Sequence, residues 1–159
     1  MSASSTQDRL LTFELAGSLY ALPIAGVLEV ADAAPLALVP TLPFEIGGVV
    51  NHQGDALPVL SQAALLEAPA SARAAAQLVV VTDGGEGSGS RLGLPVDRVI
   101  GLAPGRAALA RGLDPVAERR NIGGRMANVI DPQRLLARAR EVIATATAAA
   151  GAARPRGGE

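Results

Sequence analysis

His52 is the only histidine of the chain, and the sequence contains no cysteine. A serine–histidine–aspartate triad or a histidine-based metal site would therefore have to be built on this single residue. His52 lies in the polar stretch Asn51-His52-Gln53-Gly54-Asp55, which separates two apolar runs. We interpret it as a solvated turn residue rather than a general base, with contact to a partner as the alternative.

The other polar residues do not form a reactive pattern either. Residues 84–89 are rich in glycine but lack the Gly-Lys-Ser/Thr ending of a phosphate-binding loop. The carboxylates lack the spacing of a metal-binding loop and are scattered along the chain, at Asp83, Glu86, Asp97, Asp114 and Asp131. We therefore expect no enzyme activity, no metal and no cofactor, which leaves a binding module.

Composition favours a single aliphatic domain. The chain has 159 residues, of which 49% are hydrophobic and only 2% aromatic, so leucine, valine, isoleucine and alanine must form the core. The net charge of −1 argues against nucleic acid as a partner. No apolar run reaches the ~18 residues of a membrane span, and no signal peptide is visible, so we expect a cytoplasmic protein without direct membrane insertion. One modest basic cluster lacks the aromatic residues that stack on bases: Arg106, Arg111, Arg119, Arg120 and Arg125.

Short alternating segments between glycine and proline turns predict an all-β barrel pattern, with the strands in two groups. Glycine-containing turns predict hairpins over 10–23, 46–60 and 118–130. Pro58 cannot donate a ladder hydrogen bond, so we place the second arm of the central hairpin at a sheet edge or beside a bulge. Two helices are predicted: one over 62–66, and one over 131–143 that starts with Asp131-Pro132. The predicted organisation is a disordered N-terminus (1–9), a first barrel (about 10–66), a second barrel (about 77–130), the helix (131–143) and a flexible tail (144–159).

Several stretches together resemble a known family, the CheW-like chemotaxis coupling proteins. Residues 13–24 resemble the first hairpin of the family, and Val27-Leu28-Glu29-Val30 resembles its Val-x-Glu-Val stretch. The strongest segment is 46–60, which is similar to Gly-Val-Ile-Asn-Leu-Arg-Gly-x-x-Val-Pro-Val. Residues 92–99 and 124–136 match the later strands and the closing helix, so the resemblance covers about residues 10–143 in order.

The resemblance implies a fold and a role. The fold is two packed SH3-like five-stranded β-barrels with a C-terminal helix. The role is a non-catalytic scaffold that couples the cytoplasmic tips of chemoreceptors to the regulatory domain of a histidine kinase. Such a protein is cytoplasmic and is recruited to the inner face of the membrane through receptors. The receptor helices would lie in an apolar groove, and the implied partner-binding residues are Val27, Leu28, Glu29, Val30, Asn51, His52, Gln53 and Gly54.

The chain departs from the family at the turn. Gln53 stands where the family carries arginine, and His52 stands where it carries leucine. We expect Gln53 and Glu29 to lie close together, with Glu29 free to meet a cation of the partner; the alternative is that both side chains are solvated. A CheW-like adaptor of a non-flagellar pathway, such as type IV pilus motility, and a stand-alone β-barrel module for a ligand or nucleic acid remain the alternative functions.

Overall fold

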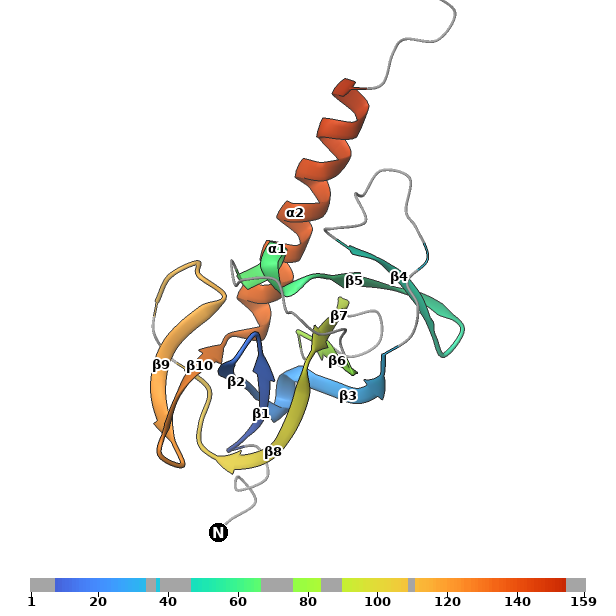
Figure 1. The fold of residues 1–159 in the computed structure, drawn as a ribbon. Helices are drawn as coiled ribbons and strands as arrows, with labels where there is room; N and C mark the ends of the chain where they lie inside the picture. Colours follow the sequence, from blue (N-terminus) through green and yellow to red (C-terminus); the bar gives the residue numbers. More distant parts are fainter. Residues whose placement is uncertain are drawn as a thin grey trace, which may run out of the picture.

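A computed structural model describes residues 8–33, 37, 47–66, 76–83, 90–108 and 111–153 (Figure 1). The described chain is mostly β, as predicted. The strands are β1 (Arg9–Leu15), β2 (Ser18–Pro23), β3 (Val27–Asp32), β4 (Gly47–His52), β5 (Asp55–Leu60), β6 (Gln77–Thr82), β7 (Arg91–Val96), β8 (Arg98–Pro104), β9 (Val116–Ile122) and β10 (Arg125–Ile130). The helices are a 3-10 turn, η2 (Ile24–Gly26), and the α-helices α1 (Gln62–Leu66) and α2 (Pro132–Ala153).

The strands form two five-stranded sheets. The first sheet has the order β8-β1-β2-β10-β9, and the second has the order β3-β6-β7-β5-β4. This corrects the predicted division into barrels at 10–66 and 77–130, because the first sheet joins both ends of the chain and the second sheet holds the middle. The division was wrong because alternation identifies a strand but not its partner. The long-range pairs of β1 with β8 and of β2 with β10 leave no local signal.

Three hairpins have two-residue turns with a positive φ at both positions. They connect β1 to β2, β4 to β5 and β9 to β10. This geometry is that of type I′ turns, whose twist matches the right-handed twist of the strands. The turn pairs are Ala16-Gly17 (φ 49° and 84°), Gln53-Gly54 (φ 55° and 88°) and Gly123-Gly124 (φ 60° and 91°). The predicted hairpins over 10–23, 46–60 and 118–130 are confirmed.

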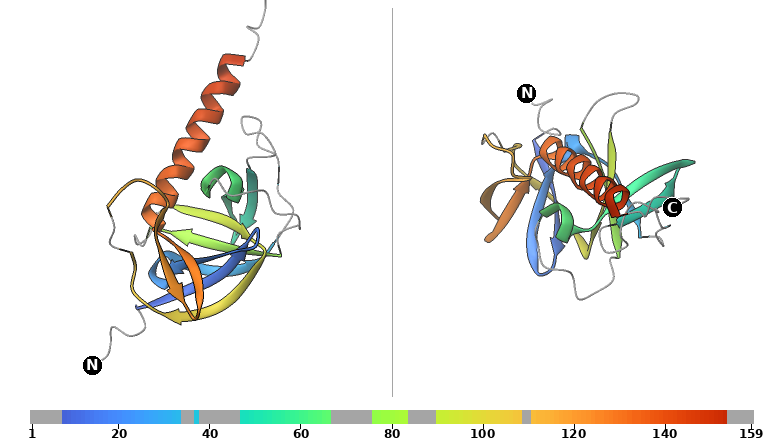
Figure 2. Two further views of the ribbon diagram at one scale, coloured as in Figure 1. Left: turned by 60° about the vertical axis from the view of Figure 1, so that its left-hand side comes forward. Right: turned by 90° about the horizontal axis from the view of Figure 1, so that it is seen from above.

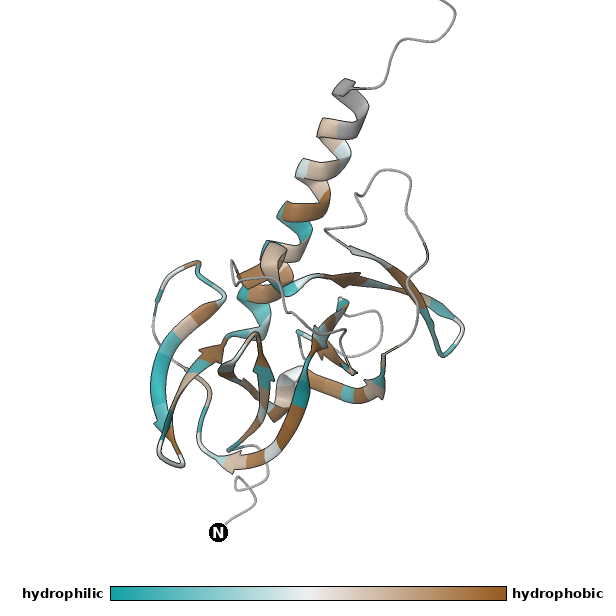
Figure 3. Ribbon diagram, in the orientation of Figure 1, coloured by the Kyte–Doolittle hydropathy of each residue, from teal (hydrophilic) through white to brown (hydrophobic). Residues whose placement is uncertain are grey.

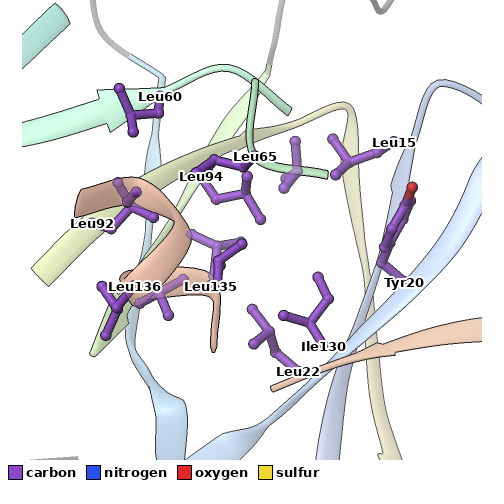
Figure 4. Packing of buried hydrophobic residues seen from close by; sticks show 14 of the residues in the cluster. Leu15, Tyr20, Leu22, Leu60, Leu65, Leu92, Leu94, Ile130, Leu135 and Leu136 are labelled. Carbon is purple, nitrogen blue, oxygen red and sulfur yellow. The ribbon is translucent and has the colours of Figure 1, made fainter. Parts of the chain in front are cut away.

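Both faces of β6, inside the second sheet, are buried. Along β6, Val79 and Val81 belong to the main hydrophobic cluster, whereas Leu78 and Val80 pack in a smaller one with Val50 and residues of β5. The main cluster also holds side chains of the first sheet and of α2, so it lies between the two sheets and the helix (Figure 4). A third, small cluster on the first sheet contains Leu10, Ala21 and Val129. The largest core is therefore shared by the two sheets.

Helix α2 begins as predicted but ends later. The Asp131 carboxylate accepts hydrogen bonds from the backbone N–H groups of Gln133 (2.9 Å) and Arg134 (3.4 Å), so Asp131 is the N-cap. The helix continues to Ala153, ten residues beyond the predicted end, and its C-terminal half projects from the sheets (Figures 1 and 2). The prediction of a flexible tail from residue 144 was wrong here because alanine has the highest intrinsic helix propensity. Residues 1–7 and 154–159, where we predicted disorder and the end of the tail, lie outside the described residues, as do residues 67–75 between the two predicted barrels.

Pro58 lies in the interior of the second sheet, because β5 lies between β7 and β4. The predicted edge position was therefore wrong. Pro58 is paired with Val49, whose own N–H and C=O bond the backbone of Ala37 on the other side. Pro58 therefore belongs to a non-hydrogen-bonded pair of β5 with β4. On the other side of β5, the only residue paired with β7 is Val59. The missing N–H costs no ladder bond with β4.

Candidate functional site

Strand β3 carries an exposed apolar strip at the edge of the second sheet. Its residues alternate between half-buried and exposed, and Leu28 is 47% exposed and Val30 38% exposed. Val27 packs against the main cluster, and the register of β3 on β6 shifts between Val27 and Glu29, so the strand is irregular at Leu28. Isolated exposed leucines are common on protein surfaces, but two exposed apolar neighbours on an edge strand form a contact surface.

The β4–β5 hairpin tip is ordered by its own side chains. The Asn51 side-chain oxygen accepts a hydrogen bond from the Gly54 N–H at 3.0 Å. Asn51, Gln53 and Gly54 are exposed, as the interpretation of a turn tip requires. His52 differs from them: it is only 8% exposed. It continues the alternation of Val50, whose side chain points into the small cluster of the second sheet.

His52 binds Glu29 across the two edges of the second sheet. The distance between His52 Nε2 and Glu29 Oε1 is 2.5 Å, and Gln53 Nε2 donates to the same oxygen at 3.2 Å. Since the carboxylate accepts, Nε2 carries the hydrogen. The interpretation of His52 as a solvated turn residue was therefore wrong. The expected proximity of Gln53 and Glu29 is confirmed, whereas the alternative of two solvated side chains is contradicted.

A second exposed apolar strip, on β8, was not predicted. Ile100 is 47% exposed and Leu102 is 52% exposed, and β8 is an edge strand of the first sheet. Figure 3 shows hydrophobic segments on both β3 and β8. The sequence carried no signal for this strip, because a period-two pattern would place the large side chains of Ile100 and Leu102 on the buried face.

The first sheet also carries an ion-pair network, which includes Arg98 on β8. Glu14 accepts hydrogen bonds from Arg125 (2.8 Å) and Arg98 (3.2 Å). The hydrogen bond from Arg125 and the nearby charge of Arg98 lower the pKa of Glu14, against the opposing effect of its partial burial. Two arginines around one carboxylate stabilise its ionised form and tie β8, β1 and β10 together.

The predicted basic cluster is partly compensated. Arg106 lies 3.6 Å from Asp8, and Arg120 pairs with Glu118 at 3.0 Å and donates to the carbonyl of Arg106. Arg119 instead lies near Tyr20, where burial raises the pKa of the phenol and the arginine charge acts in the opposite direction. These arginines therefore serve local contacts within the first sheet.

Reactive groupings are not seen in the described part of the chain. No three histidine, aspartate or glutamate side chains among those residues gather in an arrangement that could hold a metal. Within the same residues, no helix is both long and apolar enough to cross a membrane. The fold and these surfaces define a double-sheet interaction module with apolar edge strands.

Comparison with known proteins identifies the family. The family model of the CheW-like domain matches residues 9–140, so the chain belongs to the CheW-like family. The fold is also that of the crystal structure of the scaffolding protein TtCheW from Thermoanaerobacter tengcongensis, with a TM-score of 0.64 and 23% sequence identity. That match covers 79% of this chain and 84% of TtCheW. No curated protein gave a significant match.

Membership places the chain among the scaffolds and adaptors of chemotaxis-type signal transduction. The two five-stranded sheets with a C-terminal helix agree with the fold that the resemblance implied, two packed SH3-like barrels followed by a helix. The family consists of non-catalytic scaffolds, which supports the expectation that this chain is a binding module.

Proposed function

We propose that the chain couples chemoreceptors to a chemotaxis-type histidine kinase without catalysing a reaction. It works in the cytoplasm and reaches the inner face of the membrane by binding the cytoplasmic tips of receptors. The regulatory domain of the kinase is its second partner, bound through barrel-to-barrel contacts. Coupling then means that receptor binding changes the conformational equilibrium of the kinase through the scaffold.

The exposed apolar strip on β3 is the observation that supports this proposal most. A helix of a receptor tip presents apolar residues at i, i+3, i+4 and i+7, and it needs an apolar surface to cover them. Leu28 and Val30 provide such a surface beside the hairpin tip, and Ile100 and Leu102 on β8 provide a second one. The ordered tip at Asn51–Gly54 adds polar groups at the margin.

The test is titration of a soluble chemoreceptor signalling-tip fragment against the wild type and Leu28→Asp. A carboxylate at residue 28 would have to be desolvated beneath the helix, so we expect the affinity to fall by about tenfold or more. Leu113→Asp is the matched control, because Leu113 is 90% exposed and lies outside both strips. Equal binding of the wild type and Leu28→Asp would show that β3 does not bind the receptor.

The kinase contact needs its own experiment. A purified regulatory domain of a chemotaxis histidine kinase should be retained by the immobilised chain, and Leu28→Asp should still retain it. Loss of retention with Leu28→Asp would mean that both partners share one surface. No retention by the wild type would refute the kinase as partner and favour the alternative of a stand-alone module.

A further inference from the structure

The contact between His52 and Glu29 joins the two ends of the second sheet. In the strand order β3-β6-β7-β5-β4, Glu29 lies on the first strand and His52 on the last. The backbones of β3 and β4 are not paired with each other in the described part of the sheet. The side chains of His52, Gln53 and Glu29 therefore make the link between these edges, and we call these three residues the clasp.

We propose that His52 is a positioning residue of the partner-binding surface: it holds the Glu29 carboxylate against the hairpin tip. The inference rests on the proposed function, because that surface is the β3 strip. With Glu29 held, Leu28 and Val30 are presented without a carboxylate turned toward the partner. The partner that fits is a helix face that is apolar opposite these two residues and brings no cation for Glu29.

The geometry supports this role in two ways. First, the register pairs Glu29 with Val80 and Val30 with Val79, so Glu29 lies on the other face of β3 from Val30, where its side chain is 37% exposed. Second, a single carboxylate oxygen accepts from both His52 and Gln53. Charge-assisted bonds of this kind are about twice as strong as neutral ones. Glu29 is thus engaged within the chain, which corrects the expectation that it is free for a partner's cation.

Burial distinguishes the two donors of the clasp. His52 is 8% exposed and follows Val50 on the inward face of β4, whereas Gln53 is exposed at the turn. A buried, well-packed donor holds its acceptor with less loss of side-chain entropy than an exposed one. His52 should therefore account for most of the positioning of Glu29, and Gln53 for less.

The first test is a double-mutant cycle in binding. His52→Leu removes the hydrogen-bond donor and puts an apolar side chain in the same buried position. We expect this change to weaken binding of the receptor-tip fragment by about tenfold. In a Glu29→Gln background the same change should weaken binding by less than about twofold, because the carboxylate is already gone. Asp55→Asn, opposite His52 in the hairpin register, is the control and should leave the affinity unchanged.

The second test reads the hairpin tip directly. The N–H of Gly54 bonds Asn51 at 3.0 Å, and the N–H of Gly124 bonds Asn121 at 3.0 Å in the same type of turn. His52→Leu should speed hydrogen exchange at Gly54 by about tenfold and leave exchange at Gly124 unchanged, since the clasp holds the β4–β5 hairpin and not the β9–β10 hairpin. A general loss of stability would speed both.

The outcomes separate the two proposals. Suppose that Leu28→Asp weakens binding of the fragment. The positioning role of His52 is then refuted if His52→Leu lowers the affinity by the same factor in the wild type and in the Glu29→Gln variant. Unchanged exchange at Gly54 in His52→Leu also refutes it. If Leu28→Asp binds the fragment as well as the wild type does, the proposed function fails. In that case, faster exchange at Gly54 alone would still support the clasp.

Discussion

Replacing Leu94 by alanine tests whether the two sheets share one core. Leu94 lies on β7 in the second sheet and is completely buried in the main cluster. Figure 4 shows it among leucines of α1, α2 and β7, with Tyr20 of the first sheet in the same cluster. Neighbours from two sheets and a helix limit how far this site can collapse around a cavity. We therefore expect a loss of about 3–5 kcal/mol, the upper part of the range for leucine-to-alanine changes.

Urea unfolding followed by two probes measures this loss. With an m-value of about 2 kcal/mol/M, the expected loss lowers the midpoint by roughly 1.5–2.5 M. Tyr20 is the only tyrosine, and the chain has no tryptophan, so tyrosine fluorescence reports on the first sheet alone. Its ring stacks on Phe13 at a centroid distance of 6.0 Å, which makes its signal sensitive to unfolding. Far-UV circular dichroism reports on both sheets.

A shared core requires both probes to move together in Leu94→Ala. If the dichroism midpoint falls while the Tyr20 midpoint keeps its wild-type value, the sheets unfold separately and the argument from the shared cluster fails. Leu113→Ala is the matched control, because the same atoms are removed from a side chain that is 90% exposed. We expect that control to stay within about 0.5 kcal/mol of the wild type.

Two further predictions concern the first sheet. Ala16 has a φ of 49°, a left-handed conformation that asparagine tolerates better than alanine, so Ala16→Asn should raise stability by about 0.5–1 kcal/mol in the same urea assay; a lower midpoint would contradict the type I′ turn. The hydrogen bond from Arg125 lowers the pKa of Glu14 in the folded state, so its stabilisation is complete above the ordinary value of 4.5 and is lost as pH falls through the lowered value. Arg125→Gln should therefore make stability less dependent on pH on the acid side of 4.5, and an unchanged acid limb would show that Glu14 does not contribute.

Local features of the fold could be predicted from the sequence because they have local causes. The Asp131 cap and the Ser61 cap follow from short side chains that accept backbone hydrogen bonds at a helix start. The glycine-containing turns follow from the tolerance of glycine for positive φ. The sheet order could not be predicted, because the pairing of β1 with β8 joins residues that lie almost 90 positions apart and obeys no rule of local composition.

The candidate site shows where reasoning from the sequence reached its limit. The resemblance brought β3 and the hairpin tip together as one surface, and the Gln53–Glu29 contact agrees with it. His52 was misplaced because the polar residues around it were taken as one solvated turn. The turn is only two residues long, so the strand alternation of Val50 continues to His52 and directs it inward. His52, the last residue of β4, faces inward and holds the hairpin tip to Glu29, so the residue that we interpreted as a solvated turn position is the one that fixes the tip.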